Sequence, residues 1–316
     1  MTEASDASAA PRADATLAAL LLTNRLATLA AKPYTASEFW TLVEACARLD
    51  ELLTADVATI ADAAGVDQAE ALRIRTLLDA SRAFAFERER LEDGGIALVS
   101  AIDPTFPASL RARLGTSCPP FLLVAGPLEW LSASDALGIA GSPAAPDGAA
   151  LAVVRDAAGA AADRDWSVIT GLATEIDRAA IDTASARGGR CVGVPAEGIN
   201  VVSRRSEVRR RVHGRQLCLV SPYAPNARSS AAAAMGRQKI IHAMSSVTVV
   251  IGDDKNSGAA ETLERGWCPL AVWTGAGAGD GNAALIKRGA HPIDRVDQLF
   301  QPLTPTTPAE PPPALF

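Results

Sequence analysis

The sequence predicts an α/β protein with a Rossmann-like, doubly wound and mainly parallel sheet, preceded by a small all-helical N-terminal domain. Three observations predict it. From about residue 136, short apolar runs that end at glycine alternate with helical segments. Before residue 93, apolar residues recur at helical spacing. The 316 residues are 48% hydrophobic and 21% charged, which is ordinary for a soluble globular chain of about two domains.

The amino-acid composition limits the classes of function that the protein can have. A formal net charge of −6 argues against a surface coated for nonspecific binding to DNA or a membrane, but it allows one local basic groove. Five cysteines, an odd number without a C-x-x-C pair, indicate reduced thiols of a cytosolic protein rather than a disulfide framework or a zinc site. The N-terminus has no secretory signal, and the apolar stretch 17–22 is too short to span a bilayer. We expect a cytoplasmic protein with no cofactor, metal or membrane partner.

Two structural segments are predicted in the first part of the chain. Residues 1–14 are acidic and rich in small residues, so we expect disorder there. Residues 15–93 predict a helical domain of the SAM/HhH-like kind, with Ala69–Arg90 as one long helix.

A Rossmann domain is expected over 94–300, followed by a Pro-rich flexible tail at 301–316. It opens with strands at Ile96–Val99 and Phe121–Ala125 around a short helix at Ser109–Leu114. The predicted strands that follow are 137–140, 167–170, 191–194, 216–220, 247–251 and 270–273. The helices between them are 147–164, 174–187, 229–244 and 259–265.

Ligands of a doubly wound sheet bind beyond the carboxyl ends of its strands. The residues there include Gly141, Ser142, Gly171, Ser257 and Gly258. Glycine lets backbone N–H groups approach an anion closely, so together these strand ends predict a phosphate-binding rim. Any single glycine is explained as well by an ordinary strand end. A P-loop and a G-x-G-x-x-G fingerprint are both absent from the sequence, which argues against a P-loop ATPase.

The order of motifs resembles the DNA-processing protein A (DprA/Smf) family from about Asp103 to Ile293. The matching segments, in chain order, are Asp103-Pro104-x-Phe106-Pro107, Gly141-Ser142, Ile169-Thr-Gly-Leu-Ala-x-x-Ile-Asp177, Arg237-Gln238-Lys239-Ile240-Ile241, Ser257-Gly258-Ala-Ala-x-Thr262 and Gly289-Ala290. They are similar to the family's G-S-R, S-G-x-A-x-G-I-D, R-N-R-I-I and S-G-S-x-x-T motifs. Pro143 stands where the family has the arginine of G-S-R.

The resemblance implies a protein that binds single-stranded DNA, forms a homodimer and loads a RecA-type recombinase, without bond chemistry of its own. In the family, the arginine of G-S-R and the basic residues of R-N-R help to line the DNA pocket. The resemblance therefore implies that Arg237 and Lys239 line such a pocket here. Asp177 falls on a family motif and is a candidate for positioning a sugar hydroxyl or a basic pocket residue. The alternative for Asp177 is a surface ion pair with Arg178 or Arg187.

A cluster of arginines lies between residues 204 and 215 and includes Arg209 and Arg210. Clusters of this kind bind phosphates through counterion release, although most charged runs are solvated helix faces. Both interpretations stay open at this point.

A second function class is also open. Residues 257–264 loosely resemble the G-G-x-G-T-x-x-E motif of the "lonely guy" phosphoribohydrolases. This resemblance implies a nucleotide-binding sensor, or an enzyme in which Glu261 or Glu264 assists cleavage of a glycosidic bond.

Overall fold

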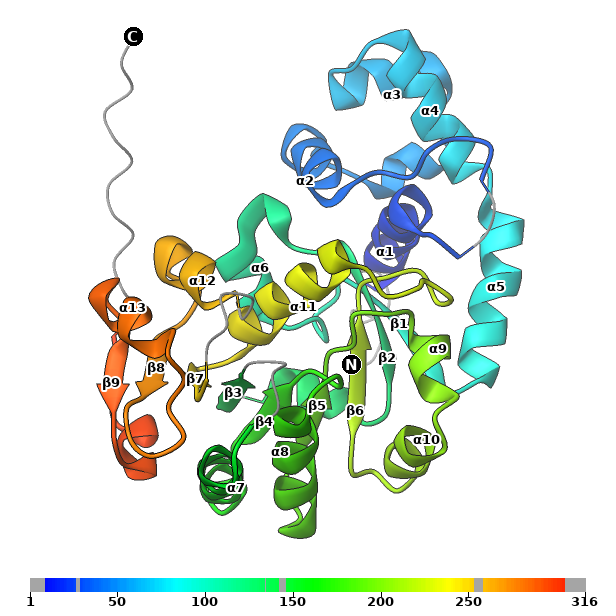
Figure 1. Ribbon diagram of the computed structural model, residues 1–316. Helices are drawn as coiled ribbons and strands as arrows, with labels where there is room; N and C mark the ends of the chain where they lie inside the picture. The colour runs from blue at the N-terminus through cyan, green and yellow to red at the C-terminus, as the bar shows by residue number, and fades with distance from the viewer. Residues whose placement is uncertain (1–8, 27–28, 134, 142–145, 253–257, 305–316) are drawn as a thin grey trace, which may run out of the picture.

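The computed structural model describes residues 9–26, 29–133, 135–141, 146–252 and 258–304 (Figure 1). One nine-stranded sheet runs through it in the order β1-β2-β6-β5-β4-β3-β7-β8-β9. Its strands are β1 (Ile96–Ser100), β2 (Phe121–Ala125), β3 (Ala136–Ala140), β4 (Ser167–Thr170), β5 (Cys191–Gly193), β6 (Cys218–Ser221), β7 (Val247–Val250), β8 (Leu270–Trp273) and β9 (His291–Ile293). Strands β3 to β9 pair in parallel, whereas β1–β2 and β2–β6 pair antiparallel. The predicted mainly parallel α/β fold is confirmed.

The sheet has a topological switch point between β3 and β7. From β3 the chain adds β4, β5 and β6 on one side, and it then returns to place β7, β8 and β9 on the other. Every residue of β3, β4 and β7 is buried. Strands that are covered on both faces consist of continuous apolar residues. The apolar runs that end at glycine therefore predicted these strands correctly.

The helices are α1 (Ala9–Thr23), α2 (Ala36–Ala45), α3 (Val57–Ala64), α4 (Gln68–Leu78), α5 (Ser81–Asp93), α6 (Ala108–Leu114), α7 (Gly148–Ala162), α8 (Glu175–Ala186), α9 (Ile199–Ser203), α10 (Ser206–His213), α11 (Ala231–Met244), α12 (Ala259–Arg265) and α13 (Asn282–Lys287). Helices α7 and α8 pack together against β3 and β4. Helices α6 and α11 cover the opposite face of these strands (Figure 1).

Two sequence expectations about the helical region are wrong. The single helix predicted over 69–90 is two helices, because the chain turns at residues 79–80 and the Arg75 side chain there binds Asp79 and backbone carbonyls of the 52–55 turn. The predicted disorder at 1–14 is contradicted from Ala9 onward, where α1 begins. Proline is tolerated in a first helical turn, and alanine is the best helix former. Residues 1–8 lie outside the described part of the chain.

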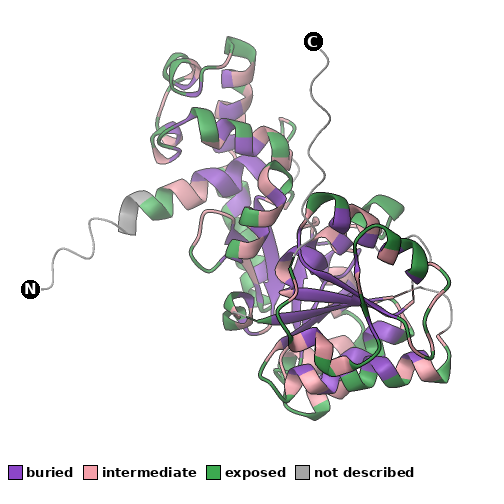
Figure 2. Cartoon of the chain, turned by 90° about the vertical axis from the view of Figure 1, so that its left-hand side faces the viewer, coloured by how far each residue is buried: buried purple, intermediate pink, exposed green. Residues whose placement is uncertain are grey.

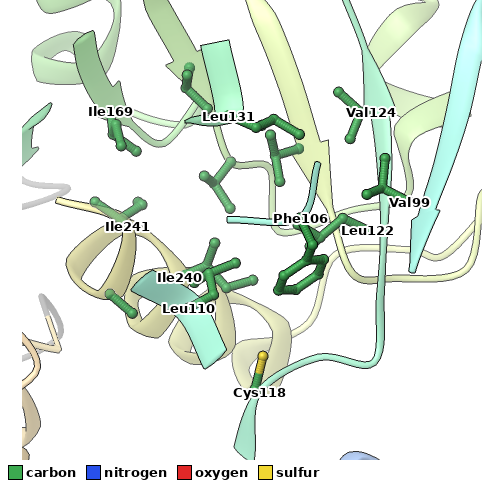
Figure 3. Close-up of a cluster of buried hydrophobic side chains, with 14 of the residues drawn as sticks. Val99, Phe106, Leu110, Cys118, Leu122, Val124, Leu131, Ile169, Ile240 and Ile241 are labelled. Carbon is green, nitrogen blue, oxygen red and sulfur yellow. The ribbon is translucent and has the colours of Figure 1, made fainter. Parts of the chain in front are cut away.

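The apolar core is continuous from the helical region into the sheet (Figure 2). Part of it is drawn in Figure 3, where Ile169 of β4, Ile240 and Ile241 of α11 and Leu110 of α6 belong to one cluster. The Trp40 indole of α2 donates to the Cys118 carbonyl at 2.7 Å, and Arg111 of α6 stacks 3.6 Å from the centre of its ring. The division into domains at 93/94 therefore stays a prediction.

Four helices and strands were not predicted from the sequence, namely α9, α10, α13 and the edge strand β9. Each is short, so hydrophobic periodicity had too few residues to reveal it. The predicted tail at 301–316 lies outside the described residues from residue 305 onward. Among the described helices, none has both the length and the apolar character needed to cross a membrane.

We predict that the native thiols resist alkylation. All five cysteines are free and buried, and burial raises the pKa of Cys118 and Cys218 to about 12 and that of Cys268 to about 11. At pH 8 a thiol of pKa 12 is about one part in ten thousand thiolate, against about a quarter for an ordinary thiol. Iodoacetamide followed by intact mass should label these three only after unfolding. Rapid labelling of the native chain would contradict this packing.

We also predict that Trp40→Phe destabilises the protein by about 1–3 kcal/mol. The ring volume is largely kept, but the buried Cys118 carbonyl loses its donor. Thermal unfolding measures the effect. The matched control is Phe86→Leu on α5, since Phe86 is 62% exposed. Equal destabilisation of both variants would show that the indole hydrogen bond contributes nothing.

Candidate functional site

The carboxyl end of β4 is organised by the Asp177 carboxylate. Asp177 is the third residue of α8 and forms a capping box with Thr174. Its Oδ2 accepts hydrogen bonds from the backbone N–H groups of Ala173 (2.9 Å) and Thr174 (2.8 Å), and its Oδ1 accepts one from the Thr170 hydroxyl (2.7 Å). Asp177 is only 6% exposed. One buried carboxylate therefore fixes the whole turn from β4 into α8.

The surface alternative for Asp177 is wrong. Arg178 pairs with Glu175, and Arg187 pairs with Asp163. The resemblance had placed Asp177 in the site, and the structure places it beside a basic residue of that site.

That basic residue is Arg237 of α11, which lies over Gly171. A β-carbon at Gly171 would be 3.3 Å from Arg237 Cζ and Nη1, and 3.1 Å from Asp177 Oδ2. A side chain at this position would be crowded by two neighbouring side chains, which would have to shift by a few tenths of an ångström. The Arg237 Nε is buried and has no hydrogen-bond partner among the described residues.

A second buried polar atom follows on the same helix. The Gln238 Oε1 is also without a hydrogen-bond partner in the described part of the chain. Gln238 packs against Gly258. A β-carbon at position 258 would lie 2.8 Å from the Cβ of Gln238. Each buried donor or acceptor without a partner destabilises the protein by about 1–3 kcal/mol. A ligand that supplies those partners therefore gains affinity. The sequence motifs did not single out Gln238, although it occupies the middle of the segment resembling R-N-R.

Lys239 does not join Arg237. Its Nζ pairs with Glu261 Oε1 at 2.8 Å and lies 5.6 Å from the centre of the Trp267 ring. Residues two apart on a helix point about 200° apart, so Arg237 and Lys239 cannot face one ligand from α11. The expectation of a cradle shared by both is therefore wrong for Lys239.

The predicted glycine rim is only partly described. A β-carbon at Gly141 would lie 2.3 Å from Ile176 Cδ1, so packing against α8 already accounts for this glycine. Ser142 and Ser257 lie outside the described residues, as does Pro143. Of the three predicted rim residues that the structure describes, Gly171 and Gly258 lie against α11 side chains with buried polar atoms.

Tyr223 packs against α11 beside this site. Its hydroxyl donates to the Ala233 carbonyl at 2.7 Å, and a β-carbon at Gly236 would be 2.7 Å from that hydroxyl. Burial raises the pKa of Tyr223 to about 12, and the positive charge of Arg237 opposes this rise. Tyr223 lines a hollow together with Gly236 and Lys239 of α11.

The arginine cluster divides into paired and unpaired members. Arg205 pairs with Glu197, Arg211 with Asp182 and Glu207, and Arg215 with Glu129. Arg204, Arg209 and Arg210 are exposed and form no ion pair with any described residue. Arg209 and Arg210 lie on α10, away from α11 in the fold (Figure 1). The solvated-face interpretation thus fits only part of the cluster.

The glutamates of the phosphoribohydrolase alternative are engaged in ion pairs. Glu261 pairs with Lys239, and Glu264 pairs with Arg288. The Thr262 hydroxyl donates to the Gly258 carbonyl at 3.0 Å, which closes this segment on itself. No group of three or more potential metal ligands occurs among the residues that the structure describes.

The fold and site define a Rossmann-type α/β protein with a half-buried arginine at the strand ends. The model of the family "DNA recombination-mediator protein A" matches residues 97–304, and the chain belongs to this family.

The solved structures agree on the fold. The chain is similar to DNA processing protein A from Streptococcus pneumoniae, with 19% identity, a TM-score of 0.64, and 85% of this chain and 98% of that one covered. It is also similar to DNA processing protein A from Helicobacter pylori, described for its single-stranded DNA binding mode, with 17% identity, a TM-score of 0.53, and 64% and 93% covered. No curated protein matches the chain.

We predict that Asp177→Asn destabilises the protein by about 1.5–3 kcal/mol. The amide keeps one acceptor but presents N–H donors where a carboxylate now accepts from two backbone N–H groups and a hydroxyl. Thermal unfolding measures the effect. Glu175→Gln is the matched control, because Glu175 lies in the same helical turn but is exposed. An unchanged midpoint for Asp177→Asn would refute the anchoring role.

Proposed function

We propose that the protein binds single-stranded DNA through a cradle formed by Arg237, Gln238 and the strand ends at Gly171 and Gly258. Binding is followed by transfer of the strand to a RecA-type recombinase, with the protein acting as a cytoplasmic homodimer. Membership of the recombination-mediator family supports the role. A relative from Helicobacter pylori is described as binding single-stranded DNA.

One observation carries this proposal, namely the buried Arg237 Nε without a partner. A guanidinium held in place over glycine presents a planar fork of donors, and phosphate oxygens match that fork. Within the described part of the chain no carboxylate forms an ion pair with Arg237, so its charge is available to an anion.

The neighbourhood suits a strand better than an isolated phosphate. Tyr223 adds a ring for contact with a base, and base–aromatic stacking contributes about 1–3 kcal/mol. Gln238 adds a hydrogen-bonding amide with no positive charge. The step itself is binding, with no bond made or broken, since Glu261 and Glu264 are occupied by Lys239 and Arg288.

We predict that Arg237→Gln weakens binding of a labelled 20-mer of oligo-dT by about 10- to 100-fold, because a charge-assisted hydrogen bond contributes about 1.5–3 kcal/mol. Fluorescence anisotropy at fixed salt measures it. Arg288→Gln at the end of α13 is the matched control, since Arg288 is exposed and paired with Glu264. Equal affinity of the wild type and Arg237→Gln would overturn the cradle.

Ligand-dependent thermal stabilisation separates the two function classes. At a hundredfold the dissociation constant, a ligand stabilises by about 2.7 kcal/mol. We expect stabilisation by oligo-dT and none by nucleoside monophosphates. The reverse pattern would favour a nucleotide sensor, and no response to either would remove both functions.

A further inference from the structure

A second basic hollow lies where the helical region meets the sheet domain, between α5 and the α9–α10 segment (Figure 1). It encloses about 270 Å³. Three arginines from two distant parts of the sequence line it, namely Arg90 of α5, Arg204 between α9 and α10, and Arg209 of α10.

The described residues do not balance the positive charge of this hollow. Arg90 pairs with Glu87, which also lines the hollow, whereas Arg204 and Arg209 form no ion pair with described residues. Their sequence neighbours Arg205 and Arg211 are both paired. Three guanidinium groups around one carboxylate repel one another, and an anion between them would relieve that repulsion.

The neutral groups of the hollow suit an oxyanion. The side chains of Asn200, Ser203 and Asn226 line it as well, and Asn200 Nδ2 donates to Asn226 Oδ1 at 3.2 Å. The Asn226 amide nitrogen keeps its own N–H donors. Guanidinium forks with amide and hydroxyl donors are the set that binds phosphate oxygens.

A neighbouring hollow is lined by Ala173 and Thr174, which follow Gly171, and by Arg205 and Arg211. Glu175, Asp182 and Glu207 line it as well, and both arginines are held in ion pairs. Among the arginines of these two hollows, Arg204 and Arg209 are therefore the ones without an ion pair to a described residue.

We propose that the hollow formed by Arg90, Arg204 and Arg209 binds phosphates of a single strand that extends beyond the cradle, so that the helical region contributes directly to binding through α5. This proposal rests on the proposed function. The shared chemistry is a phosphate group, carried either by a strand or by a free phosphate or mononucleotide.

The test compares Arg204→Gln/Arg209→Gln with the wild-type full chain by anisotropy over a series of salt concentrations. With a 20-mer of oligo-dT we expect about tenfold weaker binding, and a log–log salt slope smaller by about 0.7 for each phosphate that the variant no longer neutralises. With a 4-mer we expect a much smaller effect, because a short strand fills the cradle alone. Arg90→Gln on the separate helix α5 should lower the 20-mer affinity in the same direction.

Two controls lie on or next to the elements of the test residues. Arg215→Gln lies just after α10, where Arg215 pairs with Glu129, and Arg88→Gln lies on α5, where Arg88 pairs with Glu92. Both should bind the 20-mer as the wild type does. Unchanged thermal midpoints establish that the variants fold.

The outcomes distinguish the hollow from the cradle. If Arg237→Gln weakens the 20-mer while Arg204→Gln/Arg209→Gln and Arg90→Gln do not, the hollow is no DNA site and the cradle stands. If inorganic phosphate or dTMP stabilises the wild type but not the double variant, and oligo-dT binding is equal in both, the hollow serves a free phosphate and the strand path is overturned. If the wild type binds no oligo-dT, both proposals fail.

Discussion

The buried Asp177 carboxylate is the interaction on which the site depends. It joins the last residue of β4 to the first turn of α8 through one hydroxyl and two backbone N–H groups. The loop between them is thereby held tightly enough for Gly171 to face Arg237. A larger residue at 171 would crowd Asp177 and Arg237 together. The carboxylate, the glycine and the arginine therefore form one constraint, contributed by two separate segments of the chain.

The protein is acidic overall, and many of its arginines are held in ion pairs. An ion pair with a carboxylate neutralises the charge that an arginine would otherwise offer to a polyanion. Arg237 over the β4 end and Arg204 and Arg209 beside α10 form no ion pair with a described residue, and they line the two places proposed here for binding.

The continuous core links this chemistry to the helical region. Trp40 contacts the Cys118 carbonyl and Arg111, and the apolar cluster runs on from there into the sheet. Helix α5, which carries Arg90, is joined to β1 by a short turn. The position of Arg90 beside α10 is therefore fixed by packing and not by a flexible linker.

The sequence by itself determined the parallel α/β sheet and the short strands β2, β4 and β8 to the residue, and it predicted Arg237 and Asp177 as site residues. These follow from local information, since buried parallel strands are continuous apolar runs and a family motif preserves order along the chain. Only the tertiary structure decided that Lys239 turns away to Glu261, that Gln238 buries an oxygen without a partner among the described residues, and that Arg90 meets Arg204 and Arg209. Helix phase and long-range contact set those outcomes, and neither can be read from neighbouring residues alone.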